Sequence, residues 1–322
     1  MNVMEPIRVD YVAPTKRAFE GMKNILFRPF DIQKWFILGF SAWLACLGEG
    51  GGSSGGNGSS DFSSDDSLGG DDSVGDLVAE GANWLEENIA LVTIIGAIVL
   101  GLILVIGAVV LWLQSRGKFM FFDNVVHNRT RISEPWKEFR EVANSLFWWK
   151  LVFNIATVLA FVILICGTLF LLWPSISAET FDMNTVPFLI GAGALLFILY
   201  LAVSYIHVLL ENFVIPVMHR DRLPVNSAWK RILRLHQQRF GSFVTFFLWM
   251  ILISIGTAIA VFALVIGTCC IALIPLIIPY LGTVLLLPLY VFLRLIGPEF
   301  LKQFGSEFDT LETAEKPPLP LN

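Results

Sequence analysis

The sequence predicts an all-α integral membrane protein with six transmembrane helices, arranged as three helical-hairpin repeats that are each preceded by a basic amphipathic interfacial helix. Of 322 residues, 55% are hydrophobic and 15% are charged, whereas about a quarter are charged in a soluble domain. The apolar residues also gather into long blocks without internal charges. Because lipid offers no partners to backbone polar groups, such blocks must form helices, and a core of ~30 Å needs roughly 20 residues.

Five apolar blocks are long enough to span a bilayer, namely residues 89–113, 151–173, 186–210, 243–267 and 271–293. A sixth block, 35–47, has the length of a re-entrant or buried helix. We interpret it as spanning, because all 22 Lys and Arg residues then fall on one side of the membrane. The positive-inside rule makes that side the cytoplasm. The expected location is therefore the cytoplasmic (inner) membrane, with both termini cytoplasmic and the acidic loop 48–88 outside.

Aromatic residues at a constant spacing of eleven indicate an internal repeat. Each pair stands just before an apolar block, and the pairs are Phe19 with Phe30, Trp136 with Phe147, and Trp229 with Phe240. The predicted units are 1–113, 114–210 and 211–305, followed by a disordered cytoplasmic tail at 306–322. The loop 48–76 consists mostly of Gly, Ser and Asp. We expect it to be disordered, because such a composition buries too little apolar surface to order itself. It has no EF-hand pattern for calcium.

The segments around these aromatic pairs carry apolar residues at helical spacing and basic residues elsewhere. Such helices either lie on anionic lipid headgroups at the cytoplasmic face or pack on the spanning bundle, and the sequence leaves both open. The candidate headgroup contacts are Lys16, Arg17, Lys23, Arg131, Lys137, Arg140, Arg222, Lys230, Arg231 and Arg234.

The last apolar block is a candidate functional helix, because it contains Pro275, Pro279, Gly282 and Pro288. Proline in a spanning helix frees carbonyl groups that neighbouring helices must satisfy. We therefore expect a kinked helix inside the bundle, and broken helices also mark transporter sites.

Two polar pairs lie near the cytoplasmic ends of spans. Asp123 and His127 are four residues apart, as are His207 and Glu211, so each pair shares a helix face. If the pairs converge they form a metal or acid–base site, and if not they are interfacial ion pairs. No catalytic motif is present, so the sequence predicts no enzyme, no cofactor and no nucleic-acid partner.

Three segments carry a family resemblance: FVIPVM at 213–218, AWK at 228–230 and FGSF at 240–243, just before a span. Together they resemble the membrane domain attached to some glycerophosphodiester phosphodiesterases and its stand-alone bacterial relatives, most strongly over residues 205–300. The resemblance implies a helical membrane domain without assigned chemistry. It does not imply the enzymatic activity, because the soluble phosphodiesterase barrel is absent. The loop 48–76 and the short first span depart from the family's pattern.

These patterns favour a non-enzymatic membrane scaffold or accessory that organises lipids or partner proteins. The alternative is a transporter or channel for a lipid-like or uncharged solute, and a membrane-embedded enzyme ranks third. The expected partners are membrane lipids with anionic headgroups.

Overall fold

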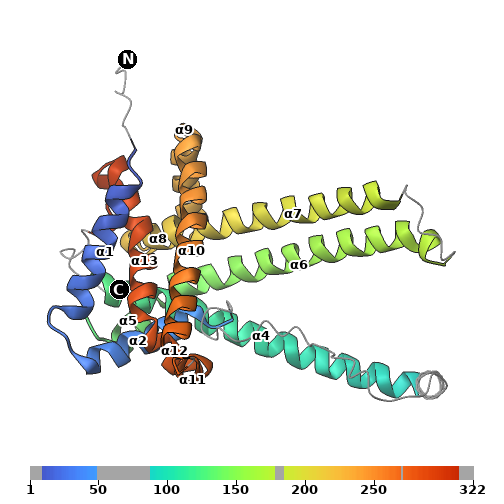
Figure 1. The fold of residues 1–322 in the computed structure, drawn as a ribbon, viewed down its shortest axis with the longest axis horizontal. Helices are drawn as coiled ribbons and strands as arrows, with labels where there is room; N and C mark the ends of the chain where they lie inside the picture. Colours follow the sequence, from blue (N-terminus) through green and yellow to red (C-terminus); the bar gives the residue numbers. More distant parts are fainter. Residues whose placement is uncertain (1–8, 49–87, 178–184, 270, 312–322) are drawn as a thin grey trace.

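The computed structural model describes residues 9–48, 88–177, 185–269 and 271–311, and every regular element in these ranges is a helix. The all-α class is therefore confirmed. Figure 1 shows a body of shorter helices from which α4, α6 and α7 project to one side. The predicted disordered loop lies, except for Gly48, outside the described residues. Residues 312–322 of the predicted tail also lie outside the described residues. Residues 306–311, which were predicted to be disordered, instead pack on the protein, with Phe308 7% exposed and Thr310 fully buried.

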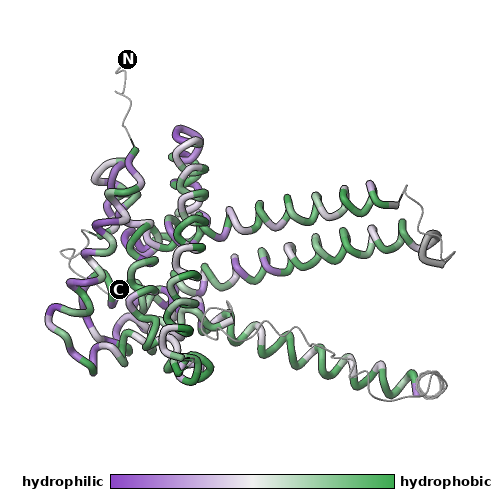
Figure 2. Tube along the Cα trace, in the orientation of Figure 1, coloured by the Kyte–Doolittle hydropathy of each residue, from purple (hydrophilic) through white to green (hydrophobic). Residues whose placement is uncertain are grey.

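Four long helices carry most of the predicted spans: α4 (Ile89–Val126), α6 (Arg140–Ser177), α7 (Thr185–Leu209) and α10 (Phe240–Gly267). Within the described ranges, four helices are long and apolar enough to cross a membrane, or up to five if one bent pair counts as a span. At most 6% of the most apolar stretch of each is buried in the protein. Figure 2 shows this apolar surface along α4, α6 and α7. Such surface needs a lipid environment, because exposure of so large an apolar area to water is unfavourable.

The shorter elements form the body. They are α1 (Val12–Phe27), α2 (Ile32–Cys46), α5 (Ser133–Glu138), η1 (Leu210–Val214), α8 (Ile215–Asp221), α9 (Val225–Gln238), α11 (Leu273–Ile277), α12 (Pro279–Leu285), α13 (Leu287–Leu301), η2 (Lys302–Phe304) and η3 (Ser306–Phe308). The predicted first span corresponds to α2, which has 15 residues and packs against α4 and α12. The carboxylate of Asp31 starts α2 by accepting hydrogen bonds from the backbone of Gln33 and Lys34.

The last apolar block is broken as its prolines predict. It forms α11, α12 and α13, and the axes of α12 and α13 are bent by 67°. Ile278 is extended and directly precedes Pro279, which begins α12. Pro288 stands in the first turn of α13, where its missing N–H costs nothing. The hydroxyl of Thr283 donates to the carbonyl oxygen of Gly39 at 3.2 Å, which ties α12 to α2.

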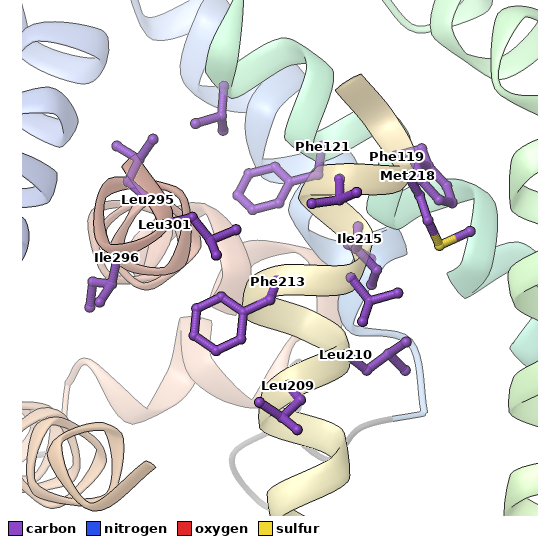
Figure 3. Packing of buried hydrophobic residues seen from close by; sticks show 14 of the residues in the cluster. Phe119, Phe121, Leu209, Leu210, Phe213, Ile215, Met218, Leu295, Ile296 and Leu301 are labelled. Carbon is purple, nitrogen blue, oxygen red and sulfur yellow. The ribbon is translucent and has the colours of Figure 1, made fainter. Parts of the chain in front are cut away.

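The core of the body forms around η1 and α8. Figure 3 shows apolar side chains of these elements, such as Phe213 and Met218, together with Phe121 of α4 and Leu301 of α13. Two glycines allow close helix crossings. A Cβ at Gly117 would lie 2.6 Å from the backbone carbon of Leu44, and a Cβ at Gly297 would lie 2.2 Å from the carbonyl oxygen of Asn212.

The predicted basic amphipathic segments each bury one face on the protein. In α9 the buried residues are Val225, Ala228, Ile232 and Leu235, at spacings of three and four. In α1 the buried face contains Ala18, Met22 and Leu26, whereas Phe19 and Phe30 are exposed. The apolar stripe therefore packs on the body, one of the two arrangements expected from the sequence, and leaves the basic face outward.

Candidate functional site

Glu211 lies on η1, a single π-helical turn between α7 and α8. π-Helical turns within α-helices are frequent at functional sites, because they redirect side chains from the regular helical positions. α13 packs closely against this turn, because Gly297 lies against the backbone of Asn212. The side-chain amide of Asn212 in turn donates to the carbonyl oxygen of Val208 at 3.0 Å.

Three cationic side chains from three helices converge on Glu211, and we call this group the Glu211 cluster. Lys118 of α4 and Lys150 of α6 both donate from Nζ to Oε1, the latter at 3.3 Å. Arg294 of α13 donates from Nη1 to Oε2 at 3.1 Å. Lys150 also donates to Oε1 of Gln114 at 3.3 Å. One carboxylate thus joins α4, α6 and α13.

The cluster is buried and cationic in the part of the chain that the structure describes. Lys118 is 2% exposed and Lys150 is 4% exposed. Nε and Nη2 of Arg294 are buried and have no hydrogen-bond partner among the described residues. The guanidinium also lies 5.2 Å from the ring centroid of Phe122. Buried charges require counter-charges and hydrogen bonds, so the site is suited to an anionic group.

A groove between α4 and α6 leads to the cluster and has a volume of about 710 Å³. Its walls are apolar side chains of α4 and α6, such as Ile103, Leu111 and Val158. Its polar lining consists of Gln114, Lys150, Asn154 and His207. The groove is therefore amphiphilic, since an apolar channel ends at a buried ammonium group.

The two predicted polar pairs separate into different places. Asp123 and His127 meet His219 of α8, with Oδ1 of Asp123 lying 3.0 Å from Nδ1 of His127 and 3.1 Å from Nε2 of His219. The hydrogen bond to Asp123 raises the pKa of His127. Glu211 instead joins the cationic cluster, and His207 lines the groove. The single site that convergence of both pairs would have formed is not observed among the described residues.

The candidate headgroup residues lie on the outside of the body. Arg17 forms an ion pair with Glu299, Arg131 with Glu134, Arg222 with Glu138, and Arg231 with Asp221. The exposed remainder comprises Lys16, Lys23, Lys137, Arg140, Lys230 and Arg234. Their contact with lipid headgroups stays a prediction. The residues Pro275, Pro279, Gly282 and Pro288 do not line the groove and belong to the broken last helix.

Sequence reasoning missed Lys118, Lys150, Arg294 and His219 as site residues. The first three count toward the charge asymmetry but gave no sign that they are buried together. A weak signal existed, because each of these three basic residues lies within a few positions of the end of an apolar block. No spacing in the sequence marks His219, since its partner Asp123 is 96 residues away.

The described residues thus form a helical protein with helices long and apolar enough to cross a membrane. The chain belongs to a family of unknown function, DUF7544, whose model matches residues 11–301. No curated protein and no solved structure matches the chain.

Proposed function

We propose that this chain is a non-enzymatic multi-pass membrane protein that binds an anionic lipid in the groove between α4 and α6. In this role it is a scaffold or accessory that organises lipids or partner proteins. The observation that carries the proposal is the amphiphilic groove, whose apolar walls end at Lys150 and, through it, at the Glu211 cluster. An acyl chain would lie along the walls, and the phosphate would accept charge-assisted hydrogen bonds at the cationic end.

The dimensions of the groove support a lipid rather than a small anion. Its α4 wall runs from Ile103 to Gln114, which corresponds to roughly 16 Å at ~1.5 Å per residue. That is about half of a bilayer core of ~30 Å, the depth that one acyl chain occupies. A free inorganic anion would leave these walls uncovered.

The proposal includes six spans, with α2 as the first and the broken α11–α13 as the last, in three repeats of two spans. It places both termini in the cytoplasm and the protein in the inner membrane. The supporting pattern is that no Lys or Arg occurs in 35–115, 151–219 or 240–293. The Glu211 cluster would then face the cytoplasmic leaflet, where anionic lipids concentrate. The division into three repeats and the resemblance to the phosphodiesterase membrane domain stay predictions from the sequence.

Lipid retention tests this proposal. The protein would be reconstituted in nanodiscs that hold equal amounts of anionic phosphatidylglycerol and zwitterionic phosphatidylcholine, and released for native mass spectrometry. We expect wild-type protein to retain phosphatidylglycerol selectively. The affinity of Lys150→Gln for phosphatidylglycerol should be roughly 10- to 100-fold lower, since a hydrogen bond to a charged group contributes about 1.5–3 kcal/mol. The variant should therefore retain less phosphatidylglycerol than wild type.

The matched control is Lys230→Gln, which removes the same charge from an exposed position on α9. It should retain phosphatidylglycerol as wild type does. Equal retention of both lipids by wild-type protein would reject the groove as an anionic-lipid site. Loss in Lys230→Gln but not in Lys150→Gln would assign lipid binding to the basic interfacial helices instead.

The broken last helix supports the alternative function, a transporter or channel for a lipid-like or uncharged solute. The 67° bend between α12 and α13 leaves backbone groups near the break that a solute could contact. Proteoliposomes with a fluorescent short-chain lipid would show faster exchange between leaflets than empty liposomes if this alternative holds. Pro288→Ala, which removes the proline beside this bend and permits a straighter helix, should then change that rate.

A further inference from the structure

A His–Asp–His cluster lies where the C-terminal end of α4 meets α8, apart from the lipid groove. Asp123 and His127 come from one face of α4, and His219 comes from α8. One possible ligand atom from each residue lies within 4.8 Å of the other two. We infer that these three side chains bind one divalent transition-metal ion, with Zn²⁺ as the best match.

The ligand types and distances fit such an ion. Zn²⁺ takes imidazole nitrogen and carboxylate oxygen at ~2.0–2.2 Å, which separates neighbouring ligand atoms by roughly 3.4 Å in a tetrahedron. The separations from Oδ1 of Asp123 are 3.0 Å to Nδ1 of His127 and 3.1 Å to Nε2 of His219. These two contacts need to lengthen by only a few tenths of an ångström to admit the ion, and the two histidine nitrogens lie within 4.8 Å of each other. Three protein ligands leave the fourth position for water.

Both imidazoles approach one oxygen of the Asp123 carboxylate, His127 through Nδ1 and His219 through Nε2. A metal ion at this point would give the shared oxygen and these two nitrogens a common partner. His219 is 3% exposed and Asp123 is 7% exposed, so little water reaches these atoms.

Neighbouring side chains hold the ligands in place. The ring of His219 stacks on Phe139 with centroids 4.5 Å apart and meets the edge of Phe122 at 4.9 Å. His127 directly follows α4, and its Nδ1 also lies 3.1 Å from the carbonyl oxygen of Asp123. The His127 side chain is 13% exposed, so an ion would reach the site from solvent at this residue. Ligands fixed in this way lose little freedom on binding, which favours affinity.

The ion would join two elements that lie far apart in the sequence. Asp123 and His219 are 96 residues apart, and α8 continues directly from η1, which carries Glu211. A metal bridge would therefore fix the position of α8 against α4 and, through η1, the carboxylate of the Glu211 cluster. The site would thus have a structural role, and its metal content can be measured without any lipid.

Metal content of the purified protein tests the inference. The probe is Zn²⁺ alone, added to tag-free protein in detergent and followed by gel filtration and elemental analysis. We expect about one Zn²⁺ per chain, and Co²⁺ in its place should give the visible absorption bands of tetrahedral coordination. Asp123→Asn keeps the shape of the side chain and should retain at least about tenfold less Zn²⁺.

The control is His236→Gln, which removes a histidine of α9 that contacts Tyr205. It should bind Zn²⁺ as wild type does. Wild-type protein that retains no Zn²⁺ and gives no tetrahedral Co²⁺ spectrum overturns the inference without reference to any variant. Undiminished binding by Asp123→Asn also overturns it, because the ion would then lie elsewhere.

Discussion

Replacing Glu211 by Gln should destabilise the protein more than any exposed ion-pair substitution. Glu211 accepts hydrogen bonds from Lys118, Lys150 and Arg294, and the first two are almost completely buried. Removing one partner of a buried ion pair costs about 3–5 kcal/mol, because the remaining charges stay desolvated without their carboxylate. We therefore expect Glu211→Gln to lower the free energy of unfolding by about that amount.

The assay is unfolding by SDS in neutral mixed micelles. Glu134→Gln is the matched control, because Glu134 pairs with Arg131 and both side chains are 57% exposed. A pair of this kind contributes about 0–1 kcal/mol. If Glu211→Gln costs no more than Glu134→Gln, the Glu211 cluster is not a buried ion-pair network and the electrostatic reasoning fails.

The same variant connects stability to lipid binding. Glu211→Gln makes the cluster more positive by one charge, so an anionic phosphate there should bind more tightly. Phosphatidylglycerol should then restore more stability to Glu211→Gln than to wild type, while phosphatidylcholine should not. Equal effects of the two lipids would separate the cluster from the lipid site.

Two further predictions follow from packing and from burial. Gly117→Ala should destabilise the protein relative to Gly107→Ala. Both substitutions gain about 1 kcal/mol of helix propensity, but only the Cβ at position 117 meets backbone atoms, and such overpacking costs about 1–3 kcal/mol. Equal free energies of unfolding in SDS would contradict the close helix crossing. Burial lowers the pKa of His236, so below a pH of about 6.5 the unfolded chain takes up a proton that the folded protein resists, and stability falls on acidification. The drop in Tm between about pH 7.5 and about pH 5.5 should be smaller in His236→Gln than in wild type, and an identical drop would reject this assignment.

Local pattern was enough to predict the long helices. The apolar blocks 89–113, 151–173, 186–210 and 243–267 all lie within helices of the structure, because uninterrupted apolar length is a local property. The break in the last block was also predictable, since Pro279 restricts the residue before it wherever it occurs. The ends of the helices were less predictable. For example, α4 continues from the apolar block to Val126, because residues 114, 115 and 117–125 are buried by the body.

The candidate site was predictable only in part. The pair Asp123 and His127 could be recognised because the two residues are four apart in the sequence. Glu211 was singled out without its three cationic partners. Its partners come from α4, α6 and α13, and no single-sequence pattern specifies which helices cross. The grouping of Lys118, Lys150 and Arg294 depends on those crossings.

The sequence by itself determined that this is a helical protein with membrane-spanning segments, because the length and apolarity of a segment decide whether it can lie in lipid. The tertiary structure alone decided which polar residues meet. Gly117 lets α4 approach α2 closely, and Gly297 lets α13 approach η1 beside Glu211. The contact of α4 with α8 brings His219 to Asp123. Burial gives these residues their chemistry, and burial is a property of packed helices rather than of any one segment.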